Sequence, residues 1–154
     1  IEQLELEAGR REIGVQLRQD VRFSEAARGA LRNGVTLTVL VDLEVRDASN
    51  LTLLADQRER YEIRYLPLSE RFQLTGGTPE VNRSFPRLRH VSAELARLRL
   101  QLATGPLAPG HYELRARMRL DRTSLPTPMQ LPAMLSSSWS HDTRWIQWPF
   151  SISA

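Results

Sequence analysis

Two long segments of the chain alternate between apolar and polar residues. From Val35 to Arg46 every odd-numbered position is apolar, and Leu40 is the one apolar residue among the even-numbered positions. From Tyr112 to Asp121 the apolar residues fall on even-numbered positions. Because a period of two places successive side chains on opposite faces, each segment is predicted to be a strand with one buried and one solvated face. The first would extend roughly 40 Å, so we expect it to curve around a core.

Shorter segments repeat the same alternation. Gly76-Gly77 is a strong turn signal, so the strand before it is expected to pair with the one after it as a hairpin. The segment 47–56 lacks the pattern and is predicted to be a loop. The further strands are predicted within 4–23 (two strands around a turn at 9–11), 61–65, 72–74, 81–85 and 139–152.

Two segments indicate helices. Ser24 is a good N-cap and Asn33-Gly34 a good stop, which predicts a short helix with a thin apolar stripe of Ala27 and Leu31. Between Leu88 and Leu102, apolar residues recur at spacings of three and four. That spacing predicts an amphipathic helix of about four turns.

The 154 residues are predicted to form one domain, 1–154, of the mainly β (α+β) class. We expect a curved antiparallel sheet or a β-sandwich-like domain with one short and one longer amphipathic helix. No apolar run approaches the roughly 18 residues that a transmembrane helix needs. The sequence opens at Ile1 rather than Met, so we expect that an upstream export signal or anchor has been removed.

Composition narrows the classes of function. All 21 basic residues are Arg, and 18 acidic residues leave a net charge of only +3. Nucleic-acid binders concentrate their basic residues on one face, whereas here Arg and Glu are interleaved along the chain. The absence of Cys excludes disulfides, thiolate metal sites and cysteine nucleophiles.

The chain offers no recognisable catalytic, metal or cofactor site. The three histidines, His90, His111 and His141, lack the spacing of converging metal ligands. The serines at 136–140 precede His141 and Asp142 but lack the glycine-flanked elbow of a serine hydrolase. We therefore expect a non-enzymatic protein without a cofactor.

Two groups of residues form the candidate interaction surface. Arg115, Arg117 and Arg119 share one face of a predicted strand, and they need either acidic neighbours or an acidic partner. All three Trp residues lie within ten positions of the C-terminal region, where they either fill the core or form a contact surface. The residues of this group are Trp139, Arg144, Trp145 and Trp148.

The order of several short motifs resembles a proteobacterial family of exported proteins, known as domain-of-unknown-function family forty-three ninety. The resemblance runs roughly from Leu17 to Trp148 and carries over no catalytic residue. The motifs are Ala30-Leu31-x-x-Gly34-Val35, Tyr61-x-Ile63-Arg64-Tyr65-x-x-Leu68 with Phe72-x-Leu74, Tyr112 to Leu120, Leu120-Asp121-x-x-x-Leu125-Pro126-x-Pro128, Trp139 and Trp145-x-x-Trp148. It implies an N-terminal signal peptide, a periplasmic or membrane-attached location, and a neighbouring membrane sensor histidine kinase as a partner.

Three hypotheses follow for the function. The first is a periplasmic interaction module that binds another cell-envelope protein and modulates a membrane sensor kinase. The second is a protein that binds a small ligand or an envelope polymer in a cleft between sheet and helix. The third, a hydrolase, would require His141, Asp142 and a serine within hydrogen-bond reach.

Overall fold

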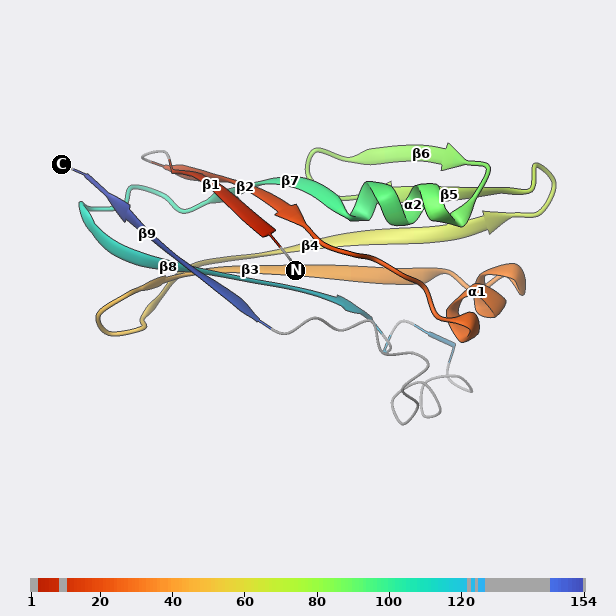
Figure 1. Cartoon of the computed structure of the whole chain (residues 1–154), viewed down its shortest axis with the longest axis horizontal. Helices are drawn as coiled ribbons and strands as arrows, with labels where there is room; N and C mark the ends of the chain where they lie inside the picture. Colours follow the sequence, from red (N-terminus) through yellow and green to blue (C-terminus); the bar gives the residue numbers. More distant parts are fainter. Residues whose placement is uncertain (1–2, 9–10, 122, 124, 127–144, 154) are drawn as a thin grey trace.

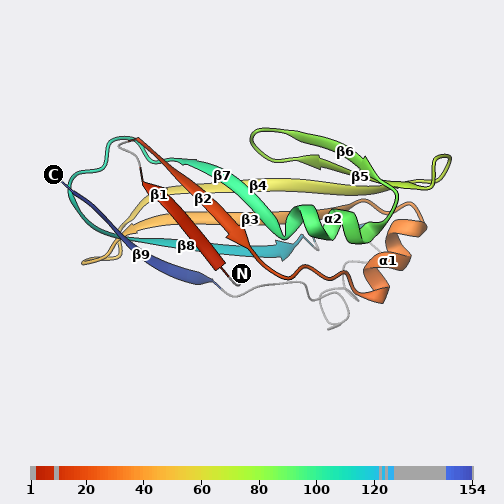
Figure 2. The same ribbon diagram turned by 45° about the horizontal axis from the view of Figure 1, so that its top comes forward.

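Two antiparallel sheets form the two layers of the molecule (Figure 1, Figure 2). The computed structural model describes the chain except residues 1–2, 9–10, 122, 124, 127–144 and 154. One sheet has six strands in the order β6-β5-β4-β3-β8-β9, and the other has three in the order β1-β2-β7. The mainly β, α+β fold predicted from the alternation is therefore confirmed.

Most elements follow one another along the chain with short connections, but residues 121–145 separate β8 from β9. Their bounds are β1 Gln3–Ala8, β2 Glu12–Arg18, α1 Glu25–Arg32, β3 Leu37–Asp47, β4 Leu53–Leu66, β5 Arg71–Gly76, β6 Val81–Phe85, α2 Leu88–Leu95, β7 Arg97–Ala103, β8 Gly110–Leu120 and β9 Ile146–Ile152. Among the described residues, no helix has the length and apolar character needed to cross a membrane.

The two strands with the clearest alternation lie side by side at the centre of the larger sheet. β3 pairs antiparallel with β8, with Val41 opposite Met118 and Asp42 opposite Arg117. The odd positions of β3 and the even positions of β8 therefore share the face that belongs to the buried core. The opposite face, which we call the outer face of the larger sheet, carries the charged residues of both strands.

A single apolar cluster joins the two layers. Leu17 of β2 and Leu100 of β7 belong to the same buried cluster as Leu43 of β3 and Ile63 of β4. Burying a side chain of this size contributes about 1.5–3 kcal/mol relative to leaving it exposed. The two sheets therefore depend on one another for their stability.

The short helix α1 begins and ends as its sequence signals predict. The Ser24 side chain accepts a hydrogen bond from the Ala27 backbone N–H at 3.1 Å, and Asn33 forms the C-cap. Gly34 follows with a positive φ of 86°, a conformation that glycine adopts without steric cost. The helix buries Ala27, Ala30 and Leu31, slightly more than the predicted stripe.

The prediction of a longer amphipathic helix over Leu88–Leu102 is wrong for the second half of that segment. α2 ends at Leu95, and Arg97–Ala103 forms strand β7, paired with β2. Leu95, Leu98 and Leu102 fit a helical spacing, but Leu98, Leu100 and Leu102 also fit a period of two. Pairing with β2 buries these three leucines and leaves Arg97 and Arg99 exposed, so tertiary pairing decides between two patterns that the same residues satisfy.

The predicted loop at 47–56 is shorter than expected. β3 continues to Asp47 and β4 begins at Leu53, which leaves a tight connection between them. The Asp47 carboxylate accepts a hydrogen bond from the Ser49 backbone N–H at 2.8 Å and so closes the turn. The strands predicted at 72–74 and 81–85 are confirmed as the β5–β6 hairpin.

Candidate functional site

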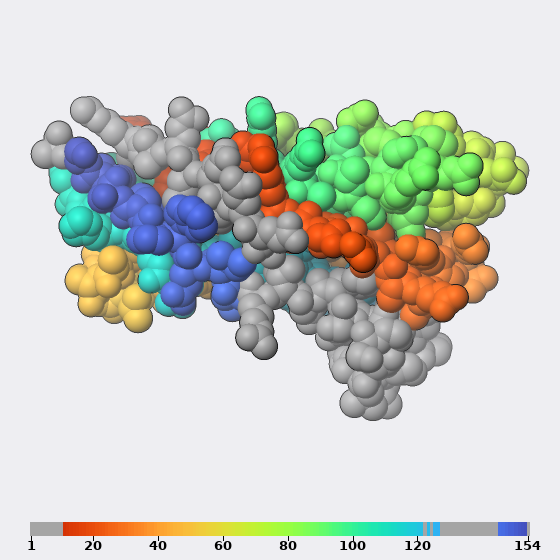
Figure 3. All heavy atoms as spheres, viewed as in Figure 1, coloured from red at the N-terminus to blue at the C-terminus, as the bar shows by residue number. Residues whose placement is uncertain are grey.

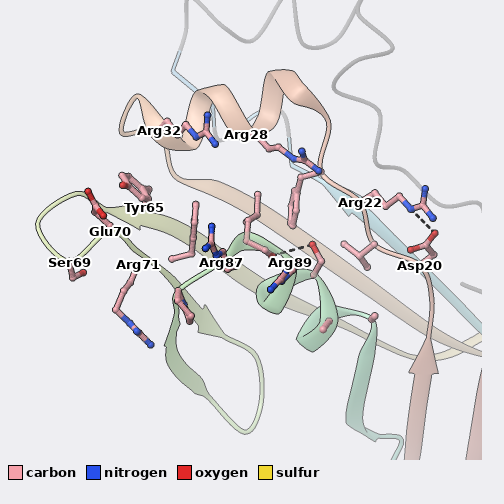
Figure 4. Close-up of a pocket in the computed structure, with 18 residues that line it drawn as sticks. Asp20, Arg22, Arg28, Arg32, Tyr65, Ser69, Glu70, Arg71, Arg87 and Arg89 are labelled. Carbon is pink, nitrogen blue, oxygen red and sulfur yellow. Dashed lines mark hydrogen bonds and ion pairs between the residues drawn. The ribbon is translucent and has the colours of Figure 1, made fainter.

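An open groove of about 1040 Å³ lies at one end of the molecule, between α1, α2 and the β4–β5 hairpin (Figure 4). We call it the arginine groove, because six arginines line it together with only two carboxylates. The arginines are Arg22, Arg28, Arg32, Arg71, Arg87 and Arg89, and the carboxylates are those of Asp20 and Glu70.

The amphipathic character of the two helices places the arginines in the groove. α1 buries Ala27, Ala30 and Leu31, and Arg28 and Arg32 follow one another by one turn on its groove side. Figure 4 shows both guanidinium groups reaching from α1 into the space between the helices.

The opposite wall is the start of α2. Val91 and Leu95 anchor this helix in the core, while Arg87 and Arg89 lie on either side of its first residue and line the groove. Figure 4 shows these two arginines between α1 and the hairpin that ends in Ser69 and Glu70. The groove therefore carries positive charge on two facing walls.

Few of these charges are neutralised by the protein itself. Arg22 pairs with the Asp20 carboxylate at 3.0 Å, whereas Arg71 donates to the Ser84 carbonyl oxygen at 3.0 Å, a neutral acceptor that leaves its charge in place. Among the ion pairs between described residues, none includes a guanidinium of the two facing walls, namely Arg28, Arg32, Arg87 and Arg89. These groups therefore leave the groove with a local excess of positive charge.

The groove also has an aromatic part. Tyr65 of β4 and Phe72 of β5 lie opposite one another in the strand register, and their ring centroids are 5.1 Å apart. Both rings are half-buried and line the groove, as does the buried Phe23. A ligand in the groove would meet guanidinium groups on the walls and aromatic surface beside them.

The predicted surface of Arg115, Arg117 and Arg119 lies elsewhere, on the outer face of the larger sheet. There the three side chains have acidic neighbours. Arg115 donates to Glu113 at 2.7 Å, and Arg117 and Arg119 donate to the same Asp42 oxygen at 3.0 and 3.3 Å. The sequence allowed either acidic neighbours or an acidic partner for these three arginines. The structure shows acidic neighbours within the protein.

Asp42 is the centre of this network. Arg58 also donates to it, at 2.7 Å, so three guanidinium groups surround one carboxylate that is only 6% exposed. Burial by itself raises the pKa of Asp42, but the hydrogen bonds from Arg58, Arg117 and Arg119 outweigh it, and the pKa falls below its ordinary value of 3.8. Asp42 is therefore held as a carboxylate.

The tryptophans that the structure describes lie at the edge strand β9. The Arg117 guanidinium lies over the Trp145 ring, 4.5 Å from its centroid, which places this ring on the outer face. Trp148 lies opposite Leu114 in the strand register and is 40% exposed. Trp139 and Arg144 lie outside the described residues, so their part in the predicted surface stays a prediction.

Other candidate chemistry finds little support where the chain is described. There, no group of three or more His, Cys, Asp or Glu side chains could hold a metal ion. His90 lies on α2 against Phe85, whereas His111 is on β8. A hydrolase would require His141, Asp142 and one of the serines at 136–140 within hydrogen-bond reach. These residues lie outside the described part of the chain.

The sequence analysis missed the arginine groove. Its signals are present, since Arg28 and Arg32 share one helix face and Arg87 and Arg89 bracket a helix start. However, more than fifty residues separate these two pairs along the chain. Only the packing of both helices at the same end of the molecule brings them together.

The family model described as "Domain of unknown function (DUF4390)" matches residues 1–149. No curated protein and no solved structure matches the chain.

Proposed function

The chain belongs to this family of unknown function, and from its surface we propose that it is a non-enzymatic binding module whose anionic ligand lies in the arginine groove. The periplasmic location and the modulation of a membrane sensor kinase, both implied by the family resemblance, are part of this proposal. The ligand is a molecule with several negative charges, such as a polymer or a segment of an envelope component.

The observation that carries the proposal is a contrast between two sets of arginines. On the outer face of the larger sheet, Arg58, Arg117 and Arg119 share Asp42, and Arg115 pairs with Glu113. The facing walls of the groove have no such partners among the described residues. An arginine cluster without internal counter-ions attracts anions and raises their local concentration.

The chemistry of the guanidinium group indicates the class of ligand. Its planar fork of donors matches carboxylate and phosphate groups, and such charge-assisted hydrogen bonds are roughly twice as strong as neutral ones. Since the arginines lie on facing walls of α1 and α2, a ligand with several anionic groups can contact both at once. Tyr65 and Phe72 add an aromatic surface for its less polar part.

The proposal corresponds to the second sequence-based hypothesis, a cleft between sheet and helix. The first hypothesis placed a protein partner on the surface of Trp139, Arg144, Trp145, Trp148 and the β8 arginines. Trp148 is exposed enough for such a contact, but Arg115, Arg117 and Arg119 already have acidic partners. The protein partner on that surface stays a prediction, and an acidic ligand is better accommodated in the groove.

Titration with a soluble polyanion tests the proposal. We expect dextran sulfate to bind the protein at low salt, and Arg28→Gln/Arg32→Gln to weaken this binding at least about tenfold, because two charge-assisted contacts are lost. The measurement is isothermal titration calorimetry at several salt concentrations, where the dependence on salt should be reduced in the variant.

The matched control is Arg11→Gln/Arg99→Gln, which removes the same charge from exposed positions outside the groove. Circular dichroism of both variants verifies that they are folded. Equal weakening by the two variants would show that only net charge matters and would refute a site in the groove.

A further inference from the structure

The most exposed large apolar side chain among the described residues lies beside the arginine groove. Leu68 is 103% exposed, whereas the other large exposed apolar side chains range from 40% to 48%. It lies at the tip of the hairpin between β4 and β5, which is the far end of the molecule beyond α1 (Figure 1, Figure 3). The three residues that follow it, 69–71, line the groove.

An exposed leucine at a tip is costly in water and gains free energy when an apolar medium receives it. A peptide seated inside the groove would not require Leu68, because this side chain points away from the protein into solvent. A bilayer has an apolar interior, which can receive Leu68, beneath a layer of head groups whose phosphates can bind the arginines of the groove.

We propose that this end of the molecule docks on an anionic lipid bilayer, with Leu68 inserted beneath the head groups and lipid phosphates held in the arginine groove. The inference rests on the proposed function, since it names the anion that the groove binds. Arg28 and Arg32 on one wall and Arg87 and Arg89 on the other contact head groups beside the inserted tip. Of the two carboxylates that line the groove, Glu70 lies on the same hairpin as Leu68, and the six arginines of the groove outnumber both.

The half-buried aromatic pair supports this orientation. Tyr65 and Phe72 lie on the two strands of the same hairpin, between the exposed tip and the body of the sheet. Amphipathic aromatic side chains such as Tyr are enriched at the level of the lipid head groups. Leu68, the aromatic pair and the arginines thus contact successive depths of the interface.

The natural absence of cysteine allows a direct test. Leu68→Cys and Leu51→Cys are each labelled with the polarity-sensitive dye NBD, and vesicles of phosphatidylglycerol and phosphatidylcholine are added. Leu51 is 48% exposed at the hairpin tip between β3 and β4, at the opposite end of the molecule, and is the matched control (Figure 1). We expect NBD emission to rise and shift to the blue at position 68 and to stay unchanged at position 51.

Two further measurements test whether the insertion of Leu68 depends on the lipid charge and on the arginines of the groove. With phosphatidylcholine alone, the response at position 68 should disappear, because the groove then meets no net negative charge. Introducing Arg28→Gln/Arg32→Gln into the Leu68→Cys protein should lower partitioning onto the anionic vesicles about thirtyfold, as expected for two basic residues near a charged surface.

The outcomes separate this inference from the function that it rests on. A response at position 51, equal responses at both positions, or no response at either would overturn membrane docking by this end. If dextran sulfate still binds through Arg28 and Arg32 in such a case, the groove is an anion site for a soluble ligand, such as an acidic peptide. If neither probe depends on these arginines, both proposals fail.

Discussion

Asp42 shows at the scale of one residue how this protein tolerates a charge inside its sheet. The side chain lies on the outer face of the larger sheet, at the middle of the central strand β3, and is almost completely shielded from water. Three guanidinium groups compensate for the lost hydration, two of them less than one third exposed. Removing the carboxylate would leave Arg117 and Arg119 half-buried without their counter-ion. An ion pair that loses one partner destabilises the fold because the remaining charge is buried without compensation.

Asp42→Asn is therefore expected to lower the free energy of unfolding by about 2 kcal/mol at neutral pH, less than a fully buried pair because Arg58 is exposed to solvent. Glu44→Gln, which breaks the Arg46–Glu44 pair of 3.0 Å, should cost less than about 1 kcal/mol. Urea denaturation of both variants measures the difference, and equal losses would contradict the central role of Asp42.

The difference in stability between the wild type and Asp42→Asn is expected to depend on pH. Because the pKa of Asp42 is lower in the folded protein than its ordinary value of 3.8, its charge contributes stability at all pH values above that value. This contribution is lost as the pH falls below 3.8 and through the lower pKa of the folded state. The difference between the wild type and Asp42→Asn should accordingly shrink in acid, and a constant difference down to the acid transition would exclude the linkage.

At the scale of elements, the end of β5 before the turn to β6 depends on a glycine that a larger residue could replace only with a shift of the backbone. Gly76 has a φ of 115°, and a Cβ added there would overlap the carbonyl oxygen of Arg60 on the neighbouring strand. Glycine is needed here for both its conformation and its small size. Gly29, within α1, has an ordinary conformation and no atom within 4 Å of such a Cβ.

The two glycines are thus expected to respond in opposite directions to the same substitution. Gly76→Ala should destabilise the protein by about 2 kcal/mol or more, because the backbone must shift. Gly29→Ala should stabilise it by about 0.5–1 kcal/mol, the difference in helix propensity. Thermal unfolding followed by circular dichroism gives both signs, and a loss of stability in Gly29→Ala would show that the helix surface is less open than the structure indicates.

At the scale of the whole molecule, the smaller sheet covers the apolar face of the larger one, and both contribute to one core (Figure 2). β7 completes the smaller sheet and also contacts β4 of the larger sheet, as its Leu100 lies fully inside the shared cluster. The Gln57 side chain on β4 donates to the Gln101 carbonyl oxygen at 2.9 Å and adds a polar link between the layers.

We therefore expect Leu100→Ala to destabilise both sheets together, by about 2–5 kcal/mol for a cavity in a packed core. Tryptophan fluorescence, to which Trp145 and Trp148 beside the larger sheet contribute together with Trp139, should give the same urea midpoint as circular dichroism. Gln101→Ala, at an exposed neighbouring position, should change stability by less than about 0.5 kcal/mol. Separate transitions in the Leu100 variant would contradict a shared core.

The sequence by itself determined the features that depend on neighbours along the chain. The alternation around Val41, broken only at Leu40, and that around Leu114 predict β3 and β8, because buried and solvated faces impose a period of two on the side chains. Ser24 and Asn33-Gly34 similarly locate α1, since caps act within a few residues of the helix end.

The tertiary structure alone decided what depends on distant partners. Leu98, Leu100 and Leu102 fit either a helix or a strand, and pairing with β2 selects the strand. Asp42 reaches Arg117 and Arg119 only through the β3–β8 register. The arginine groove exists because α1 and α2 are fixed at the same end of two packed sheets. The order of residues along the chain does not show how close these two helices lie in space.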